Sequence, residues 1–539
     1  MTDVLVDGET LTPEDVEAVA REDARVELAD GARDAVRASR ERVEDVLDSH
    51  EAVYGVNTGF GSLVDTRIDA EDLEALQTNL LRSHAAGAGD ELEREAVRAL
   101  LLTRLNALAK GYSGIREAVL DLLVGMLNER VHPVVPSRGS LGASGDLAPL
   151  AHLAVVLIGE GEARVSPRDT ERASGEPRAD VDGNRLPGDE ALAAAGLEPV
   201  TLQAKEGLAL INGTQLTTGL AALALLDAER ALRAADAAGA LTTEVTMSTT
   251  ANCDPAIHEV RPHAGQAASA RNVKRLTADS EVVESHRNCD RVQDAYSIRC
   301  LPQVHGAVRD ALAHLREAVE VELNSATDNP LVFDGDRVNS RASGTDRAAV
   351  VSGGNFHGEP LALRLDYAAS ALTELAAVCE RRTDRLLNPE IQESHLPPFL
   401  SPESGLHSGL MIPQYTAASL VNDLRSLGRP ATDNIPVSGN QEDHVSMSAG
   451  SAWGFREAAE KTASVVGVEL LCAAQAREFV DGDLALGAGT AAVYDLVREV
   501  SPAVSEDRSL SGEMAAVADL IREGLVDESV ERALGERLA

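Results

Sequence analysis

Residues 143–146 have side chains that permit unusual backbone chemistry. Ala143, Ser144 and Gly145 are small, Asp146 follows them, and an apolar stretch that predicts a helix comes next, in GSLGASGDLAPLAHLA (139–154). Small residues invite tight turns, because little side chain is present to clash. A turn needs only one or two such residues, so the run of three requires a further explanation.

A backbone cyclisation provides that explanation. The nitrogen of Gly145 can attack the carbonyl of Ala143, because glycine has no Cβ to block a close approach and alanine is small. Loss of water from Ser144 then leaves an exocyclic methylene. The product is a methylidene-imidazolone, a strong electrophile that ordinary side chains do not supply. A helix beginning near Leu147 would direct its positive N-terminal dipole at this ring and favour developing negative charge.

Polar clusters, five of which contain glycine, interrupt the helical pattern at six other places. These are YGVNTGFGS (54–62), NLLRSHAAGAG (79–89), LINGTQ (210–215), QDAYSIRCLPQVHG (293–306), SGGNFHGEP (352–360) and NQEDHVSM (440–447). Taken singly, each cluster is explained as well by a loop that joins two helices.

Several standard catalytic motifs do not fit the sequence. GVNTGFGSL lacks the last glycine of G-x-G-x-x-G, and no G-x-x-x-x-G-K-[ST] occurs. HEVRPH (258–263) would need histidine rather than proline at position 262 to be the H-E-x-x-H zinc motif, and Asp146 breaks G-x-S-x-G. Nucleotide, metal and serine-hydrolase chemistry therefore lose support, and we expect no metal site.

The stretch 139–154 resembles the prosthetic-group signature of the aromatic amino acid ammonia-lyases. The other clusters match the same family in order, over nearly the whole chain. Within the family the chain is most similar to members that act on histidine. Ser83 and His84 stand where the phenylalanine and tyrosine enzymes carry other residues, and Glu442 stands where the phenylalanine enzymes usually carry glutamine.

The resemblance implies a reaction and a prosthetic group. We expect elimination of ammonia from L-histidine to give trans-urocanate, the first step of histidine degradation. The 4-methylidene-imidazol-5-one would form from Ala143, Ser144 and Gly145, with no external cofactor. Either the amino group or the imidazole ring of the substrate could bond to it.

The resemblance also implies roles for individual residues. Tyr54 matches the catalytic base, and Arg299 matches the residue whose forked guanidinium binds the substrate carboxylate. His84 and Glu442 would face the imidazole, a group that both donates and accepts hydrogen bonds. The other matches line the pocket or assist ring formation: Asn212, Gln293, Tyr296, Phe356 and Asp146. A bare helix cap at Asp146 would look the same in the sequence.

Two kinds of alternative stay open. A phenylalanine or tyrosine ammonia-lyase, or an aminomutase, would share the ring, but Ser83, His84 and Glu442 argue against these enzymes. A non-catalytic helical scaffold would keep the fold, but the intact 143–145 tripeptide and Tyr54 argue against it.

The resemblance implies a mainly α, aspartase/fumarase-like fold and a homotetramer with shared active sites. In that arrangement Tyr296 and Arg299 reach each site from a neighbouring chain. We divide the chain into an N-terminal domain (1–203) that carries the Ala-Ser-Gly loop and a long-helix bundle (204–539).

The sequence pattern itself favours a mainly α fold. Thr12 and Pro13 predict the N-terminus of a first helix, after a short strand in DVLVDG (3–8). Long helical patterns follow residue 204, for example in 359–382 and 457–479. Two charged stretches rich in proline or glycine, 166–190 and 334–348, predict loops.

The charge of the chain limits its partners. The 539 residues have a formal net charge of −39, and only four of the basic residues are lysine. Nucleic acid and anionic membranes are therefore poor partners on electrostatic grounds. A strongly acidic surface with little lysine indicates adaptation to high salt, where counterions screen the self-repulsion.

The location expected from the sequence is the cytoplasm. The N-terminus has no basic region followed by an apolar segment, so we expect no signal peptide. No apolar stretch approaches membrane-spanning length. The five cysteines are scattered and form no C-x-x-C, which indicates reduced thiols.

Overall fold

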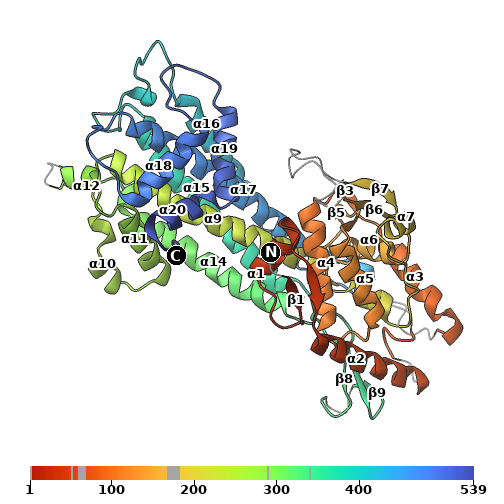
Figure 1. Cartoon of the computed structure of the whole chain (residues 1–539). Helices are drawn as coiled ribbons and strands as arrows, with labels where there is room; N and C mark the ends of the chain where they lie inside the picture. The colour runs from red at the N-terminus through yellow and green to blue at the C-terminus, as the bar shows by residue number, and fades with distance from the viewer. Residues whose placement is uncertain (1–2, 50–52, 59–67, 167–182, 288–290, 339–341) are drawn as a thin grey trace. The chain divides into compact units, whose positions relative to one another are not determined.

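The computed structural model describes residues 3–49, 53–58, 68–166, 183–287, 291–338 and 342–539 (Figure 1). The chain forms two compact units, each built from three separate segments. Unit 1 comprises 1–223, 316–365 and 429–453, and unit 2 comprises 224–315, 366–428 and 454–539. The division at residues 203 and 204 expected from the sequence stays a prediction.

Unit 1 contains eight complete α-helices among its described residues. They are α1 (Pro13–Arg21), α2 (Asp30–Asp48), α3 (Leu73–His84), α4 (Arg94–Ala109), α5 (Glu117–Asn128), α6 (Leu147–Leu157), α7 (Gly188–Ala194) and α8 (Glu206–Ile211). The first helix follows from local signals, because Thr12 Oγ1 accepts a hydrogen bond from the Asp15 backbone N–H and the Asp15 carboxylate accepts one from the Thr12 backbone N–H in a capping box.

Short strands of unit 1 form four small sheets. A parallel pair joins β1 (Val4–Val6) to β2 (Val26–Leu28), and an antiparallel pair joins β3 (Ala88–Glu91) to β5 (Pro136–Arg138). The two three-stranded sheets are antiparallel. Their strand orders are β4 (Val131–Pro133), β6 (Glu162–Val165), β7 (Asn184–Pro187), and β8 (Leu331–Asp334), β10 (Ala348–Val351), β9 (Ser343–Gly344).

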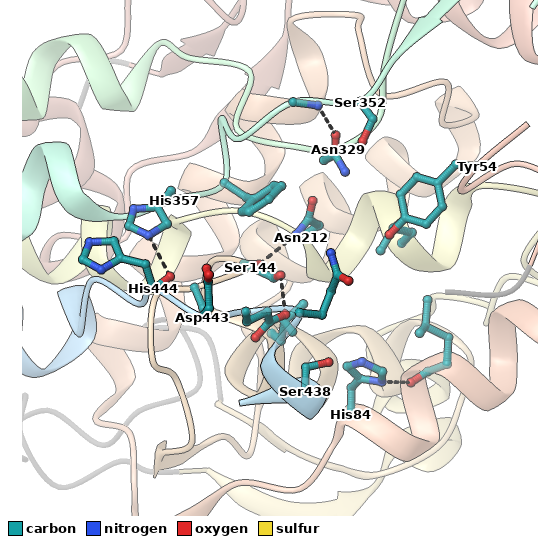
Figure 2. Close-up of a pocket in the computed structure, with 18 residues that line it drawn as sticks. Tyr54, His84, Ser144, Asn212, Asn329, Ser352, His357, Ser438, Asp443 and His444 are labelled. Atoms are coloured by element: carbon teal, nitrogen blue, oxygen red, sulfur yellow. Dashed lines mark hydrogen bonds between the residues drawn. The ribbon is translucent and has the colours of Figure 1, made fainter. Parts of the chain in front are cut away.

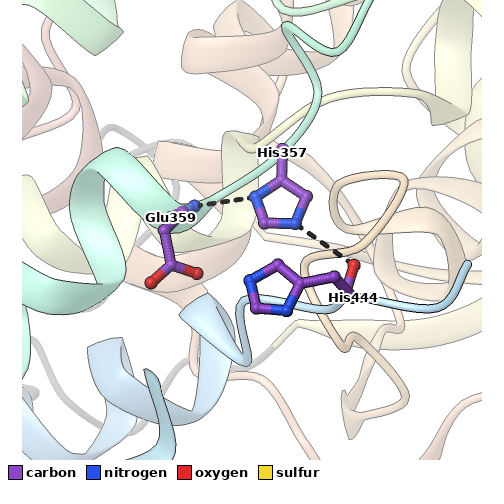
Figure 3. A group of neighbouring side chains, drawn as sticks. All are labelled: His357, Glu359 and His444. Carbon is purple, nitrogen blue, oxygen red and sulfur yellow. Dashed lines mark hydrogen bonds between the residues drawn. The ribbon is translucent and has the colours of Figure 1, made fainter. Parts of the chain in front are cut away.

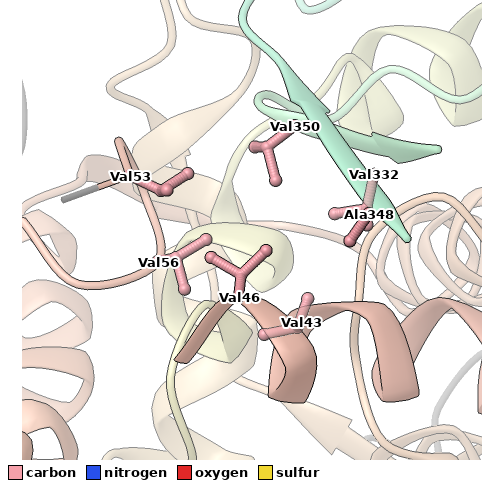
Figure 4. Packing of buried hydrophobic residues seen from close by; sticks show 7 residues of the cluster. All are labelled: Val43, Val46, Val53, Val56, Val332, Ala348 and Val350. Carbon is pink, nitrogen blue, oxygen red and sulfur yellow. The ribbon is translucent and has the colours of Figure 1, made fainter. Parts of the chain in front are cut away.

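A buried aliphatic cluster fixes the turn that carries Tyr54 (Figure 4). Val53 and Val56, on either side of this turn, pack with side chains of α2 and of strands β8 and β10; these are Val43, Val46, Val332, Ala348 and Val350. Burying each such side chain stabilises the fold by about 1.5–3 kcal/mol. The turn is therefore anchored on both sides of Tyr54.

Unit 2 consists of helices and the loops between them, with no strand among its described residues. Its complete α-helices are α10 (Pro255–Glu259), α11 (Ala264–Leu276), α12 (Glu281–Ser285), α13 (Tyr296–Arg299), α16 (Met411–Arg425), α18 (Ala488–Val500), α19 (Ser511–Arg522) and α20 (Leu525–Leu534). Four longer helices contribute residues to both units: α9 (Gln215–Val245), α14 (Leu301–Leu323), α15 (Glu359–Leu387) and α17 (Ser448–Arg477).

A buried polar network links these four long helices inside unit 2. His305 of α14 donates from Nδ1 to Asp236 of α9 at 2.7 Å and accepts at Nε2 from Arg382 of α15 at 3.1 Å. Arg382 also donates from Nε to Glu469 of α17 at 2.5 Å. Removing one member of such a buried pair typically costs about 3–5 kcal/mol, so the network fixes how the helices pair.

The mainly α fold expected from the sequence is confirmed. The prediction of a loop over 166–190 is wrong for its last residues, because β7 pairs with β6 there and α7 begins at Gly188. Residues 167–182 of this stretch lie outside the described part. In 334–348, β9 interrupts the expected loop. Within the described residues, every helix is too short or too polar to cross a membrane.

Candidate active site

A cavity of about 740 Å³ lies in unit 1 (Figure 2). Seven residues singled out in the sequence line it: Tyr54, His84, Ala143, Ser144, Asn212, Phe356 and Glu442. They come from five of the polar clusters and from the Ala-Ser-Gly loop. The fold therefore collects segments that are hundreds of residues apart in the chain around one space.

The Ala-Ser-Gly loop is pressed against the segment before α9. Gly145 has φ +72°, in the left-handed region, and forms a parallel bridge with Gly213. The next backbone N–H, of Asp146, donates to the Gly213 carbonyl at 2.7 Å. A Cβ at position 145 would lie 2.2 Å from that same oxygen. Only glycine fits this position, and the observation agrees with the small residue that ring closure requires.

Asp146 holds the loop through its side chain. The carboxylate is fully buried and accepts hydrogen bonds from Ser140 Oγ at 2.5 Å and from the Thr217 backbone N–H at 2.9 Å. Burial raises the pKa of Asp146, and these hydrogen bonds oppose the rise. The side chain makes no capping bond to its own helix, α6. Asp146 is therefore no bare cap of α6, since it binds the first turn of α9 instead.

The other side of the loop is bound to two more pocket segments. The Leu141 carbonyl accepts from the Met447 backbone N–H at 2.7 Å, and the Gly142 carbonyl accepts from Ser446 Oγ at 2.9 Å. Gly142 also accepts from the Gly358 backbone N–H at 3.1 Å. These bonds place the segments that carry Glu442 and Phe356 against the loop.

Ser144 stands at the centre of this arrangement. Its Oγ donates to Glu442 Oε1 at 2.7 Å, and its carbonyl accepts from Asn212 Nδ2 at 2.8 Å (Figure 2). The buried Oδ1 of Asn212 has no hydrogen-bond partner among the described residues. The Ser144 hydroxyl, which ring formation is expected to remove, is thus hydrogen-bonded to Glu442, the carboxylate that is expected to bind the substrate.

Arg104 holds the backbone of Asn212 in place, and it was not identified from the sequence. The guanidinium is fully buried and donates to the Asn212 carbonyl at 2.9 Å and to Gln215 Oε1 at 2.7 Å. Burial lowers the pKa of Arg104 to about 10. An arginine inside the apolar run RALLLTRLNALA (98–109) was the available signal, because such a charge is rarely buried without a specific partner.

His84 and Tyr54 both line the cavity, and Figure 2 draws Tyr54 at the upper right with His84 below it. His84 ends α3, and its Nδ1–H donates to the Leu80 carbonyl at 2.9 Å, which leaves Nε2 as the acceptor of the neutral ring. Tyr54 lies in the turn fixed by the aliphatic cluster. Gly55 tightens that turn with φ +74°, and a Cβ there would lie 2.6 Å from Cδ of Pro330.

Three predicted residues do not line this cavity. Gln293, Tyr296 and Arg299 belong to unit 2 and form a cluster of their own. Arg299 donates to Gln293 Oε1 and lies over the Tyr296 ring at 5.8 Å. All three are exposed in the single chain, and Tyr296 retains 73% of its accessible surface.

A group that could bind a metal ion borders the same cavity, although the sequence predicts none. His357, Glu359 and His444 each offer a ligand atom, and these atoms lie within 4.8 Å of one another.

The fold and cavity are those of an enzyme: a helical scaffold holds a hydroxyl, a carboxylate, an imidazole and a phenol around one space. The chain belongs to the aromatic amino acid lyase family, whose pattern matches residues 11–499.

Individual relatives agree with this family. The chain is 76% identical, over 99% of both chains, to a probable histidine ammonia-lyase of Halobacterium salinarum. It is 49% identical to the histidine ammonia-lyase of Myxococcus xanthus over 94% of each chain. Among solved structures, histidine ammonia-lyase from Trypanosoma cruzi matches with a TM-score of 0.87 at 38% identity, covering 99% of this chain and 96% of that one. Tyrosine aminomutase from Streptomyces globisporus matches with 0.90 at 36%, covering both chains fully.

Proposed function

We propose that this protein eliminates ammonia from L-histidine and releases trans-urocanate. The observation that carries the proposal is the 2.7 Å hydrogen bond from Ser144 Oγ to Glu442 Oε1, with His84 lining the same cavity. A carboxylate and an imidazole acceptor suit the ring of histidine, which donates and accepts hydrogen bonds, and would gain nothing from a phenyl ring. The relatives named as histidine ammonia-lyases support the same substrate.

The residues present fit a methylidene-imidazolone formed from Ala143, Ser144 and Gly145. Position 145 accepts only glycine, and Asn212 donates to the Ser144 carbonyl, which would remain as the carbonyl of the ring. When formed, this group supplies an electrophile that assists departure of the amino group. Loss of the Ser144 hydroxyl would free Glu442 Oε1 to accept a hydrogen bond from the substrate.

Side chains of the protein remove the proton and orient the substrate. Tyr54 removes the proton from Cβ of the substrate, and its fixed turn keeps the phenol oxygen in place for the transfer. Glu442 and His84 orient the imidazole. Phe356 and Asn212 border the space that the substrate occupies.

We further propose that the substrate carboxylate is bound by Arg299 of a neighbouring chain in a homotetramer. Support comes from the exposure of Gln293, Tyr296 and Arg299 in the single chain, since exposed tyrosine and arginine side chains that lie against each other are typical of surfaces that meet another chain. We also propose that the protein works in the cytoplasm and is adapted to high salt. The relative from Halobacterium salinarum and the net charge of −39 support the latter.

The test is to incubate the purified protein with histidine, phenylalanine and tyrosine separately and to record conjugated products by ultraviolet absorbance. We expect urocanate from histidine only. Ser144→Ala should keep its melting temperature, keep the full sequence mass, and lose nearly all activity, whereas the wild type should be lighter by two waters. Ser137→Ala, a serine outside the cavity, is the matched control. Turnover of tyrosine to a β-amino acid, or an active Ser144→Ala variant, would contradict the proposal.

A further inference from the structure

His357, Glu359 and His444 form a compact group at the edge of the cavity (Figure 3). His357 and Glu359 lie where the 352–358 segment enters α15, and His444 lies in the segment that also carries Glu442. All three belong to unit 1. The group therefore bridges two segments that line the cavity.

The hydrogen bonds of His357 engage one ring nitrogen only weakly. Its Nε2–H donates to the backbone carbonyl of His444 at 3.3 Å, so the neutral ring carries its lone pair on Nδ1. That Nδ1 accepts a long hydrogen bond from the Glu359 backbone N–H at 3.4 Å, which a metal ion would replace (Figure 3). A histidine that donates through one nitrogen to a backbone carbonyl and presents the other is arranged as metal-binding histidines usually are.

Glu359 and His444 each have side-chain polar atoms with no hydrogen-bond partner among the described residues. Oε2 of Glu359 is buried and accepts no hydrogen bond from any described residue. A buried carboxylate oxygen without a donor is costly, and a cation would remove that cost. The His444 ring is stacked on His357, with centroids 5.7 Å apart and planes 6° apart. Across the described part of the chain, its nitrogens have no hydrogen-bond partner either.

We propose that His357, Glu359 and His444 bind one divalent transition-metal ion of the Zn²⁺ class. Two imidazoles and one carboxylate suit Zn²⁺, Co²⁺ or Ni²⁺, whereas Mg²⁺ and Ca²⁺ prefer oxygen ligands only. Zn–N distances of about 2.0–2.1 Å place two ligands at most about 4.2 Å apart. The three ligand atoms, which now lie within 4.8 Å of one another, would draw closer together when the ion binds.

The bound ion would join the segment that carries Phe356 to the segment that carries Glu442. Its remaining coordination positions would hold water. The proposal concerns binding alone and does not depend on which amino acid the enzyme uses.

The test is titration of chelator-treated, full-length protein with Co²⁺ in high-salt buffer, followed by visible ligand-field absorption and by elemental analysis of the dialysed protein. We expect one ion per chain. His357→Ala, His444→Ala and Glu359→Gln should each weaken Co²⁺ binding by about tenfold or more. His286→Ala, which removes a partly exposed histidine of unit 2, should bind Co²⁺ as the wild type does.

A second readout separates loss of the site from loss of the fold. Zn²⁺ should raise the melting temperature of the wild type and of His286→Ala but not that of Glu359→Gln, whose metal-free melting temperature should equal that of the wild type. Absence of Co²⁺ absorption in the wild type would overturn the proposal. Equal binding by the wild type and the three site variants would overturn it as well, since the ion would then bind elsewhere.

Discussion

Replacing Gly145 by alanine tests how tightly the reactive loop is held. The added Cβ would meet three backbone atoms of Gly213, its O at 2.2 Å, C at 2.4 Å and N at 2.6 Å. No side-chain rotation relieves a clash with backbone. The 143–146 loop must therefore move away from the segment before α9, and this movement breaks the Asp146–Gly213 and Asn212–Ser144 hydrogen bonds.

The expected loss of stability has two parts. Alanine in the left-handed region costs about 1–2 kcal/mol. Each of the two broken hydrogen bonds adds about 0.5–1.5 kcal/mol. The free energy of unfolding should therefore fall by about 2–5 kcal/mol. Maturation should fail too, because the Gly145 nitrogen no longer approaches the Ala143 carbonyl.

Gly196→Ala is the matched control. Gly196 has φ +71°, almost the same as Gly145, but nothing lies within 4 Å of its would-be Cβ. It should lose only the conformational part, about 1–2 kcal/mol, and should mature and work normally. Urea unfolding at high salt gives the stabilities, and intact mass shows whether two waters have been lost. Equal losses of stability in the two variants, or full maturation of Gly145→Ala, would refute the reasoning.

Three further predictions concern the substrate, salt and assembly. Glu442→Gln should lower kcat/KM for histidine by about 10–150-fold, since a hydrogen bond to a charged group contributes about 1.5–3 kcal/mol, and should leave the melting temperature unchanged; unaltered kinetics would contradict this role. Dialysis into dilute buffer should abolish activity and assembly, measured by size-exclusion chromatography, because less screening strengthens the repulsion within a chain of net charge −39; full activity there would remove the argument for salt adaptation. Tyr54→Phe and Arg299→Ala should each be nearly inactive, yet mixed tetramers should regain activity; no gain over the separate variants would place both residues in one chain of each site.

Much of the fold could be predicted because its signals are local. The capping residues Thr12 and Pro13 mark the start of α1, and apolar spacing marks the long helices. The strand β7 escaped prediction, because its sequence NRLP is polar and its pairing with β6 reaches across the intervening charged segment. The sequence also did not predict which segments make up unit 1. Three stretches that are far apart in the chain pack together in it, and no local pattern within one stretch indicates the other two.

The candidate site was predictable in its residue types but not in its support. Resemblance to the family indicated Ser144, Asn212 and Glu442, and their roles stay predictions. The bonds between them join residues 68 and 298 positions apart, which no local pattern specifies. Arg104 was overlooked for a related reason: its partners, the Asn212 carbonyl and Gln215, are more than 100 residues away in the chain.

The cavity segments share one feature that follows from the positions of the helices. The loop at 143–146 directly precedes α6, Asn212 precedes α9, His357 precedes α15, and the segment that carries Glu442 precedes α17. Each helix N-terminus carries roughly half a positive charge, together with backbone N–H groups that lack partners within the helix. Four such ends follow directly on segments that line one cavity, whereas two C-terminal ends, those of α3 at His84 and of α8 before Asn212, adjoin it with the opposite sign; the N-termini outnumber them, so the backbone favours negative charge there on balance. Removal of a proton from Cβ of an amino acid develops negative charge on the substrate. A chain with only four lysines can thus stabilise that charge without placing one of them in the lining of the cavity.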